Sequence, residues 1–382
     1  MALTFEQGPI RPPSEARSLL IRVTRNCPWN KCAFCFTYQG EKFGLRKLEE
    51  IKRDIKNARE IADSVKELSW KHGAGGEVSE GLVDLVFGSP HMFDDYFRSI
   101  TAWLYFGGRS VFLQDANSII LKTDELLEVL NCIKENFPQV DRITSYCRSQ
   151  TAARKSVEDF RKLREAGLNR IHIGLETGYD PLLKLIRKGS TAAEHIEGGK
   201  RVVESGISLC EYVMPGLGGS KWSRENAVET ARVINEIKPD YIRFRSLQVK
   251  RGTVLHEMMQ KGEFQPLGDE EVVGEIRLFI EHLEGIRSTI VSDHILNLLE
   301  ELEGRLPEEK ESMLAIIDRF FGLPEMDRMI YRLGRRKGLY RRIDDLSNRP
   351  VYERLKSIIQ NYRETGSERL DRDLDRIRQN FI

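Results

Sequence analysis

Three of the six cysteines of the chain lie within nine residues, in the segment Cys27-Pro-Trp-Asn-Lys-Cys32-Ala-Phe-Cys35. Thiolates are ligands for zinc and for iron–sulfur clusters, and a closed site of either kind takes four protein ligands. Three thiolates leave one metal position for another molecule. Two alternatives stay open, a zinc knuckle with a distant fourth ligand and three unrelated buried thiols. No second Cys-x-x-Cys or His-x3-His pair is present to complete a zinc site.

Alternating apolar runs predict the elements that position this loop. Residues 18–24 form a predicted strand before the cysteines, and apolar residues between Leu45 and Leu68 recur at helical spacing after them. Five further strands are predicted at 110–115, 142–147, 169–176, 207–214 and 240–247, with helices between them at 123–137, 156–167, 191–204 and 223–237. Six strands that alternate with helices are typical of a parallel sheet with helical crossovers.

The same pattern suggests three regions along the chain. A proline-containing arm occupies 1–17, the βα region 18–250, and a helical extension 251–382. Residues 71–108 interrupt the alternation and are interpreted as an insertion, which either forms a substrate wall or only covers the rim. Residues 334–338, Gly-Arg-Arg-Lys-Gly, are interpreted as a basic turn in the extension.

Composition limits the classes of function. The chain has 382 residues, of which 40% are hydrophobic, and its 60 basic and 59 acidic residues give a net charge of +1. No overall field therefore favours nucleic acid or an anionic membrane. No apolar run approaches the ~20 residues of a membrane span, and the N-terminus lacks a signal-peptide pattern. Few, clustered cysteines fit a reducing compartment, so we expect a cytoplasmic protein. Oxygen would destroy an exposed iron–sulfur cluster at these cysteines, so such a cluster would need an anaerobic or oxygen-shielded setting.

The cysteine segment resembles the cluster loop of the radical S-adenosylmethionine (radical SAM) superfamily. The last two cysteines keep the family spacing, whereas four residues instead of three separate Cys27 from Cys32. The resemblance covers about residues 18–250. It implies an α/β fold, a partial (β/α)6 TIM-like barrel, to which the helical C-terminal extension is added here. It also implies that Cys27, Cys32 and Cys35 bind a [4Fe–4S] cluster, whose fourth iron is chelated by SAM.

The resemblance further implies a reaction. A reduced cluster cleaves SAM, and the resulting 5′-deoxyadenosyl radical takes hydrogen from a substrate, while the protein binds, orients and excludes water. The expected activity is that of an oxidoreductase or transferase on an unidentified small molecule, with an electron donor such as flavodoxin or ferredoxin. The pattern is nearest to the broad group of oxygen-independent coproporphyrinogen oxidase-like and tRNA-modifying enzymes. A tRNA-modifying radical SAM enzyme and a non-catalytic iron–sulfur binding protein stay as alternatives, so nucleic acid is not excluded as a partner.

Residues at the ends of the strands are the candidates for cofactor binding, because active sites of parallel βα barrels lie there. Phe34 matches the aromatic residue that lies near the adenine in the family. Gln114 and Asp115 replace the family's glycine-rich turn, whose glutamate binds the methionine amino group. The alternative for Asp115 is a helix-capping or turn role. Arg148 could pair with the SAM carboxylate through a bidentate fork or lie on the surface.

Two candidates follow the fourth and fifth predicted strands. The segment from Gly174 to Gly178 resembles the family's "GLESG" segment, so Glu176 is expected to contact the ribose or methionine end of SAM. A carboxylate that closes an apolar strand is costly to bury without a partner. Gly216 is expected beside the adenine, where a glycine lets the backbone approach a flat ring; the alternative is an ordinary loop.

Other chemistry-bearing residues have two interpretations each. Arg243 and Arg245 share one face of the sixth strand and either bind an anionic substrate or are solvated. Cys132 and Cys210 are predicted core residues, whereas Cys147 is a spare thiol near the expected mouth. His294 either reaches the site or is structural. The one local basic cluster offers either an RNA-binding face or a solvated one; it consists of Arg332, Arg335, Arg336, Lys337, Arg341 and Arg342.

Overall fold

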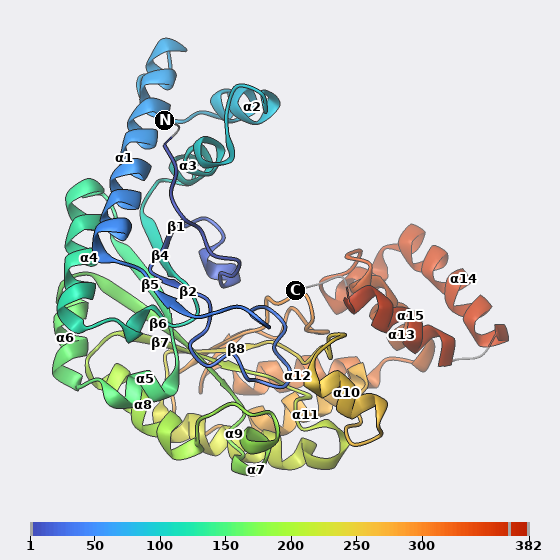
Figure 1. The fold of residues 1–382 in the computed structure, drawn as a ribbon. Coiled ribbons are helices and arrows are strands. Elements are labelled where there is room, and N and C mark those ends of the chain that lie inside the picture. Colours follow the sequence, from blue (N-terminus) through green and yellow to red (C-terminus); the bar gives the residue numbers. More distant parts are fainter. Residues whose placement is uncertain (1–2, 366–367, 380–382) are drawn as a thin grey trace. The chain divides into compact units, whose positions relative to one another are not determined.

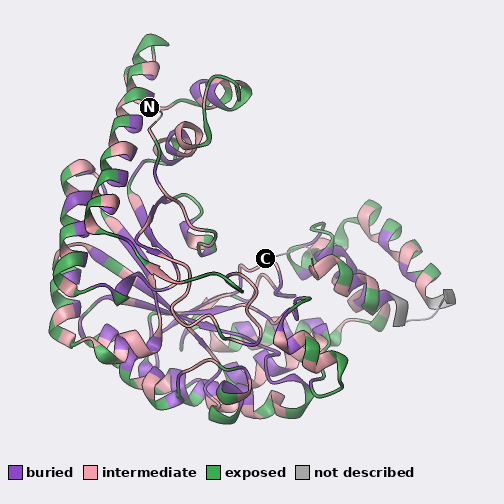
Figure 2. Ribbon diagram, in the orientation of Figure 1, coloured by how far each residue is buried: buried purple, intermediate pink, exposed green. Residues whose placement is uncertain are grey.

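The computed structural model describes residues 3–365 and 368–379. It divides into two compact units. Unit 1 comprises Met1–Asn30, Thr37–Ile173 and Arg201–Leu209, and unit 2 comprises Lys31–Phe36, Gly174–Lys200 and Cys210–Ile382. Each unit has its own strands and its own buried side chains (Figures 1 and 2).

Unit 1 contains a parallel sheet whose strands follow the chain order. Its strands are β1 (Leu19–Arg22), β4 (Ser110–Gln114), β5 (Arg142–Cys147) and the first residues of β6 (Leu168–Glu176). Leu19 pairs with Val111, Val111 with Ile143, and Ile143 with Leu168. Val111, Phe112 and Leu113 are fully buried, as expected of parallel strands that are covered on both faces.

Helices cover the sheet of unit 1. They are α1 (Leu48–Lys71), α2 (Glu80–Gly88), α3 (Asp95–Tyr105), α4 (Thr123–Asn136), α5 (Ser149–Arg154) and α6 (Val157–Glu165), with short 3-10 helices η1 (Pro13–Glu15) and η2 (Ser118–Ile120). α1 packs against α3 and α4 (Figure 1). Its inner face carries apolar residues at helical spacing, such as Ile51, Ile55 and Ala58, which are buried. A small antiparallel pair, β2 (Thr24–Arg25) and β3 (Gly44–Leu45), brackets the cysteine segment.

Unit 2 continues the alternation of strands and helices. The parallel strands β7 (Ser208–Val213), β8 (Tyr241–Phe244) and β9 (Thr289–Val291) pair in that order, and β10 (Gly304–Arg305) joins β9 in antiparallel orientation. The helices are α7 (Asp180–Leu185), α8 (Ala192–Glu204), α9 (Gly219–Ile237), α10 (Val254–Gln260), α11 (Asp269–Glu281), α12 (Lys310–Gly322), α13 (Glu325–Arg336), η3 (Ile343–Ser347), α14 (Arg349–Thr365) and α15 (Glu368–Gln379).

The predicted fold class is confirmed. Mostly parallel strands alternate with helices, as in a partial TIM-like barrel, and the C-terminal region is largely helical. The six predicted strands correspond to β1, β4, β5, β6, β7 and β8. The domain boundaries at 17/18 and 250/251 stay predictions. None of the described helices is long and apolar enough to cross a membrane.

The largely helical C-terminal region also contains two short strands, β9 and β10, which the sequence pattern does not predict. His294 follows β9. The expected basic turn at 334–338 begins on α13. Arg335 and Arg336 are buried, because they pair with Glu300 at 3.0 Å and Asp269 at 2.6 Å, and they offer neither a solvated nor an RNA-binding face.

Candidate functional site

The three clustered cysteines differ from the other three in exposure. Cys27, Cys32 and Cys35 are of intermediate exposure, whereas Cys132, Cys147 and Cys210 are buried. The burial of Cys132 and Cys210 agrees with their predicted core positions, and Cys147 is buried at the end of β5, where its Sγ donates to the carbonyl of Arg148. Partly accessible thiols on a short loop are the donor set that an iron–sulfur cluster requires. The three clustered cysteines therefore fit an iron–sulfur cluster.

Backbone hydrogen bonds hold the second half of the cysteine loop in unit 2. The amide of Cys35 donates to the carbonyl of Cys32 at 3.2 Å, which closes a tight turn between the two thiols. Between them, Ala33 donates to Ile186 at 2.8 Å and accepts from Leu255 at 2.9 Å. Cys27 belongs to unit 1. The described residues hold no group of three His, Cys, Asp or Glu side chains already arranged for a metal, so the convergence of the three sulfurs stays a prediction.

Gln114 and Asp115 are already engaged in unit 1. The Gln114 amide accepts from the backbone N–H of Gly8 at 2.8 Å and donates to the carbonyls of Gly8 at 3.1 Å and Ile10 at 2.7 Å. Asp115 is fully buried and pairs with Arg22 at 2.8 Å. Binding of the SAM amino group by this pair, which stays a prediction, would require these contacts to be exchanged.

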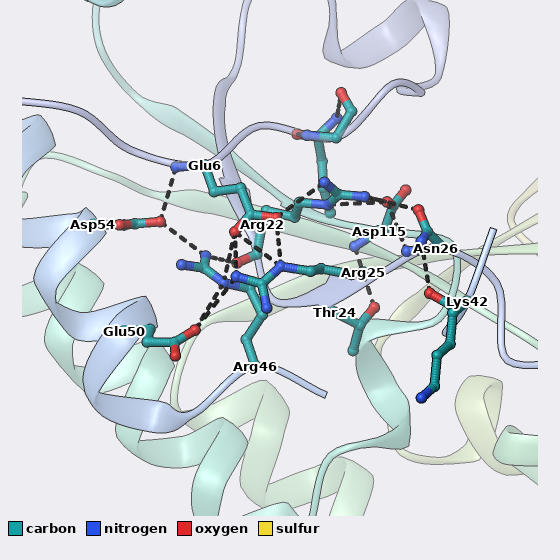
Figure 3. Close-up of polar contacts among 12 residues, drawn as sticks. Glu6, Arg22, Thr24, Arg25, Asn26, Lys42, Arg46, Glu50, Asp54 and Asp115 are labelled. Carbon is teal, nitrogen blue, oxygen red and sulfur yellow. Dashed lines mark hydrogen bonds and ion pairs between the residues drawn. The ribbon is translucent and has the colours of Figure 1, made fainter. Parts of the chain in front are cut away.

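Asp115 also accepts bonds from two residues that flank the cysteine segment. The backbone N–H of Asn26 donates to Asp115 at 3.2 Å, and the Tyr38 hydroxyl donates to its other oxygen (Asn26 and Asp115 are labelled in Figure 3). Asn26 precedes Cys27 directly and adopts a positive φ of 65°. Asp115 therefore fixes the backbone where the cysteine loop begins.

The N-terminal arm contributes a carboxylate to a network of arginines, which Figure 3 shows. Glu6 pairs with Arg25 at 2.6 Å, Arg22 at 3.0 Å and Arg46 at 3.3 Å. The hydrogen bond from Arg25 is the main cause that lowers the pKa of Glu6. Arg46, which is almost wholly buried, also pairs with Asp54 at 2.8 Å. The arm is thus tied to α1 and to the end of β1 by charge-assisted bonds.

Arg148 lies at the start of α5 in unit 1. Its guanidinium carbon lies 5.2 Å from the centre of the Trp29 ring, within the cysteine segment, which is cation–π distance. Its backbone N–H donates to the Asn117 side chain at 3.0 Å. The arginine is therefore neither isolated nor far from the loop, and its role toward a SAM carboxylate stays a prediction.

In unit 2, Glu176 closes β6 and forms an ion pair with Lys188. The Lys188 Nζ lies 2.9 Å from Glu176 Oε1, and each side chain is 12% exposed. Glu176 adopts a positive φ of 65°, a conformation that is uncommon for a non-glycine residue and is found mostly at constrained positions. The Lys188 ammonium lies 6.0 Å from the centre of the Phe34 ring. Phe34 itself packs against two apolar clusters, one that contains Ala33 and Leu255 and one that contains Ile186 and Leu217.

Strand β7 of the same unit carries a buried carboxyl. Glu211, on β7, is fully buried, and neither of its oxygens has a hydrogen-bond partner among the residues that the structure describes. Burial raises the pKa of Glu211 well above its usual range; the charge of Lys188 opposes this effect and the charge of Glu176 adds to it. Burial therefore favours the protonated form of Glu211 over the carboxylate.

Gly216 is held by a third buried carboxyl. It adopts a φ of +85°, which favours glycine, and its N–H donates to Glu275 on α11 at 2.8 Å. Glu275 also accepts from Ser223 at 2.6 Å and Asn226 at 2.8 Å. Burial raises the pKa of Glu275 to about 7. The side chain of Glu275, which lies 59 residues away in the sequence, therefore holds the turn after β7 in place.

The remaining candidates do not form an open cationic face. Arg243 is buried and pairs with Asp293 at 3.2 Å, so the solvated interpretation is wrong for this residue. Arg245 donates its backbone N–H to Val213 at 3.0 Å. His294 accepts from the N–H of Leu296 at 3.2 Å through Nδ1, which is a local structural bond.

The sequence patterns predict some of the residues of the candidate site and miss others. Within unit 2, Phe34 and Glu176 each lie near Lys188, and their binding of the cofactor stays a prediction. Glu211 and Glu275 are missed, and Lys188 has no predicted role. A glutamate in the middle of the apolar strand 207–214 is the signal that could have revealed Glu211, since such a residue is rarely buried without a partner.

Comparison with known proteins gives a match over the middle of the chain. Residues 84–231 match the family model described as "Radical SAM superfamily". A curated relative, the tRNA uridine(34) acetyltransferase of Methanocaldococcus infernus, is 27% identical over 119 residues, which cover 31% of this chain and 22% of the relative. The uncharacterized protein YtqA of Bacillus subtilis is 23% identical over 103 residues, 27% of this chain and 31% of the relative.

Among solved structures, coproporphyrinogen III oxidase (HemN) from Escherichia coli has a TM-score of 0.41 at 14% identity. That alignment covers 69% of this chain and 52% of the oxidase. The match to the archaeal acetyltransferase covers less than a quarter of that protein's length.

Proposed function

We propose, from the match of residues 84–231 to the radical SAM superfamily model, that this chain is an enzyme that cleaves SAM reductively and removes hydrogen from a small-molecule substrate. The observation that carries the proposal is the short loop that presents three partly exposed cysteines, Cys27, Cys32 and Cys35. These thiolates would hold three irons of a [4Fe–4S] cluster and leave the fourth for SAM. A cluster of this kind supplies one-electron cleavage of SAM and hydrogen-atom abstraction when it is bound.

The side chains around the loop bind and orient in this proposal. Phe34 offers a flat apolar surface for the adenine, and the backbone at Gly216, fixed by Glu275, lets the ring approach closely. Glu176 would accept hydrogen bonds from the ribose hydroxyls or the methionine end. Arg148, held beside Trp29, would pair with the SAM carboxylate. An electron donor such as flavodoxin or ferredoxin is required as a partner.

Anaerobic reconstitution with iron and sulfide, followed by SAM and dithionite, tests the proposal. We expect charge-transfer absorbance of a four-iron cluster and release of 5′-deoxyadenosine. Cys35→Ala should abolish both. Cys210→Ala, which removes a buried thiol of unit 2 outside the loop, serves as the matched control and should retain the cluster. A retained cluster without any SAM cleavage, even with cell metabolites present, would favour the non-catalytic iron–sulfur protein instead.

Modification of a tRNA is the second candidate function, and the name of the archaeal relative favours it. The buried positions of Arg335 and Arg336 count against the basic cluster that was expected to serve it. The two candidates differ in one measurement. If tRNA is the substrate, adding unmodified tRNA should raise the yield of 5′-deoxyadenosine per enzyme, whereas cell metabolites freed of RNA should not.

A further inference from the structure

Asp115, which directly follows β4, is fully buried, and its carboxylate accepts four hydrogen bonds. Arg22 donates two of them, from Nε at 3.2 Å and from Nη2 at 2.8 Å, and the backbone N–H of Asn26 donates the third at 3.2 Å. The hydroxyl of Tyr38 donates the fourth to the other oxygen. Because an ionised carboxylate offers about four acceptor positions, these donors already fill it (Arg22, Asn26 and Asp115 are labelled in Figure 3).

The donors to Asp115 lie on both sides of the cysteine segment. Asn26 directly precedes the first cysteine, and Tyr38 comes three residues after the last one. Arg22 Nη2 also donates to Asn26 Oδ1 at 3.1 Å, so the backbone and the side chain of Asn26 both bind within this group. One carboxylate therefore joins the two flanks of the loop that carries the three cysteines.

Two asparagine side chains bind the two sides of the loop to each other. Asn26 Nδ2 donates to the carbonyl of Lys42 at 2.8 Å. Asn30 Nδ2 donates to the carbonyls of Tyr38 and Glu41. Both asparagines adopt a positive φ, 65° and 48°, in the left-handed region, which asparagine enters more readily than most residues. Specific contacts within unit 1 thus shape the backbone on each side of the first cysteine.

Gly8 of the N-terminal arm packs against the Asp115 carboxylate. A Cβ atom at this glycine would lie 3.1 Å from Asp115 Cγ and from Oδ2, so a side chain here would press on the carboxylate. The arm is held in this position by Gln114, which both accepts from the N–H of Gly8 and donates to its carbonyl. The contacts therefore place Asp115 inside the protein, bound by backbone, arginine and tyrosine, and a ligand could reach it only by replacing one of these donors.

We propose that Asp115 is a positioning residue for the iron–sulfur cluster: it holds both flanks of the cysteine loop and so orients Cys27 toward iron. This inference rests on the proposed function, because it concerns the cluster on which that function depends. The carboxylate acts through Asn26 and Tyr38, and Arg22 balances its charge. The role replaces the expectation that Asp115 binds the amino group of SAM, since the same acceptor positions cannot serve both at once.

Tyr38→Phe tests the proposal, because it removes one hydroxyl and leaves the Asp115 carboxylate in place. Hydrogen exchange of the apo chain, read by mass spectrometry on residues 23–31, reports opening of the Asn26 N–H bond. On the holoprotein, the rate at which EDTA bleaches the absorbance of the oxidised cluster reports how firmly the loop holds iron. We expect both rates to rise about tenfold, the effect of losing one hydrogen bond to a charged group.

A spectroscopic signature separates positioning from a general loss of stability. The reduced cluster of Tyr38→Phe should show altered EPR g values in the absence of SAM, because the sulfur of Cys27 is reoriented. Tyr352→Phe is the matched control: it also removes one tyrosine hydroxyl that is bonded to an aspartate, Asp327 at 2.7 Å, and it should behave as wild type. Asp115→Asn, which keeps one acceptor oxygen and loses the charge, should exceed Tyr38→Phe in all three measurements.

Wild-type exchange, bleaching and g values in Tyr38→Phe would overturn the positioning role. If the wild type nevertheless cleaves SAM, the proposed function survives that failure. If Tyr38→Phe speeds exchange in the loop while the wild type assembles no cluster, Asp115 holds the loop but the proposed function fails. If Asp115→Asn weakens SAM binding with loop exchange as in wild type, the carboxylate belongs to the cofactor and the inference is wrong.

Discussion

Replacing Glu275 by glutamine should change how the stability of the protein depends on pH. The carboxyl is buried under the turn after β7 and accepts hydrogen bonds from Gly216, Ser223 and Asn226. Glutamine has the same shape and keeps one acceptor oxygen, but it cannot ionise. Burial is the main cause that raises the pKa of Glu275 from 4.5 to about 7, and the three hydrogen bonds only partly oppose it.

The sign and size of the effect follow from proton linkage. Between pH 4.5 and about 7 the folded protein keeps a proton on Glu275 that the unfolded chain has lost. The folded state therefore binds more protons, and the free energy of unfolding falls as pH rises through this window. The pKa difference, about 7 minus 4.5, corresponds to about 3 kcal/mol, because each tenfold change in proton affinity is worth ~1.4 kcal/mol.

Urea unfolding of wild type and Glu275→Gln at several pH values between 5 and 8 provides the assay, since the window ends near the pKa of about 7. The difference between the two proteins should already change with pH at pH 5, because the carboxyl of the unfolded chain ionises above its ordinary pKa of 4.5. The variant should then gain on wild type by about 3 kcal/mol toward pH 8, where the wild-type carboxylate is ionised in the interior. Parallel stability curves over the whole range would refute the reasoning, because they would mean that Glu275 titrates at its ordinary pKa in the folded protein.

Three further outcomes are expected. Gln114→Ala removes three hydrogen bonds to the N-terminal arm, worth ~1 kcal/mol each, so the arm should become sensitive to limited proteolysis while α4 stays protected. Asp269→Ala should lower the free energy of unfolding by ~3–5 kcal/mol in denaturant titrations, because buried arginines lose their counterion; an unchanged midpoint would contradict a buried network. Gly174→Ala should displace the Glu176–Lys188 pair and weaken SAM binding in calorimetry by about tenfold, the worth of one charge-assisted hydrogen bond of ~1.5 kcal/mol; unaltered affinity would remove Glu176 from the cofactor site.

The elements of the fold could be predicted because their signals are local. Strands such as 110–115 are continuous apolar runs, and α1 shows its buried stripe in the spacing of Ile51, Ile55 and Ala58. β9 and β10 could not be found in this way, since three and two residues carry no period. Their pairing depends on β8 and on the folded sheet.

In the candidate site, too, the features with a local sequence signal could be predicted and those that depend on distant residues could not. The cysteine spacing is a local signal and identifies the loop. The partners of buried polar groups are set by distant residues, so the sequence does not show that Gln114 binds the arm or that Glu275 binds Gly216. Arg335 and Arg336 mislead for the same reason, because a run of basic residues indicates a solvated face unless acidic partners lie elsewhere in the chain.

The carboxylate of Asp269 joins helices that are far apart in the chain. It meets Arg332 and Arg336 of α13 and Arg378 of α15 at the first residue of α11, and the charge of Arg336 is the strongest influence that lowers its pKa against burial. This shared carboxylate constrains which substitutions can be accepted at Asp269 and at its three arginine partners during evolution. No single substitution among the arginines can compensate for loss of the acid, so descendants that abandon this contact should be found to have replaced the whole set together.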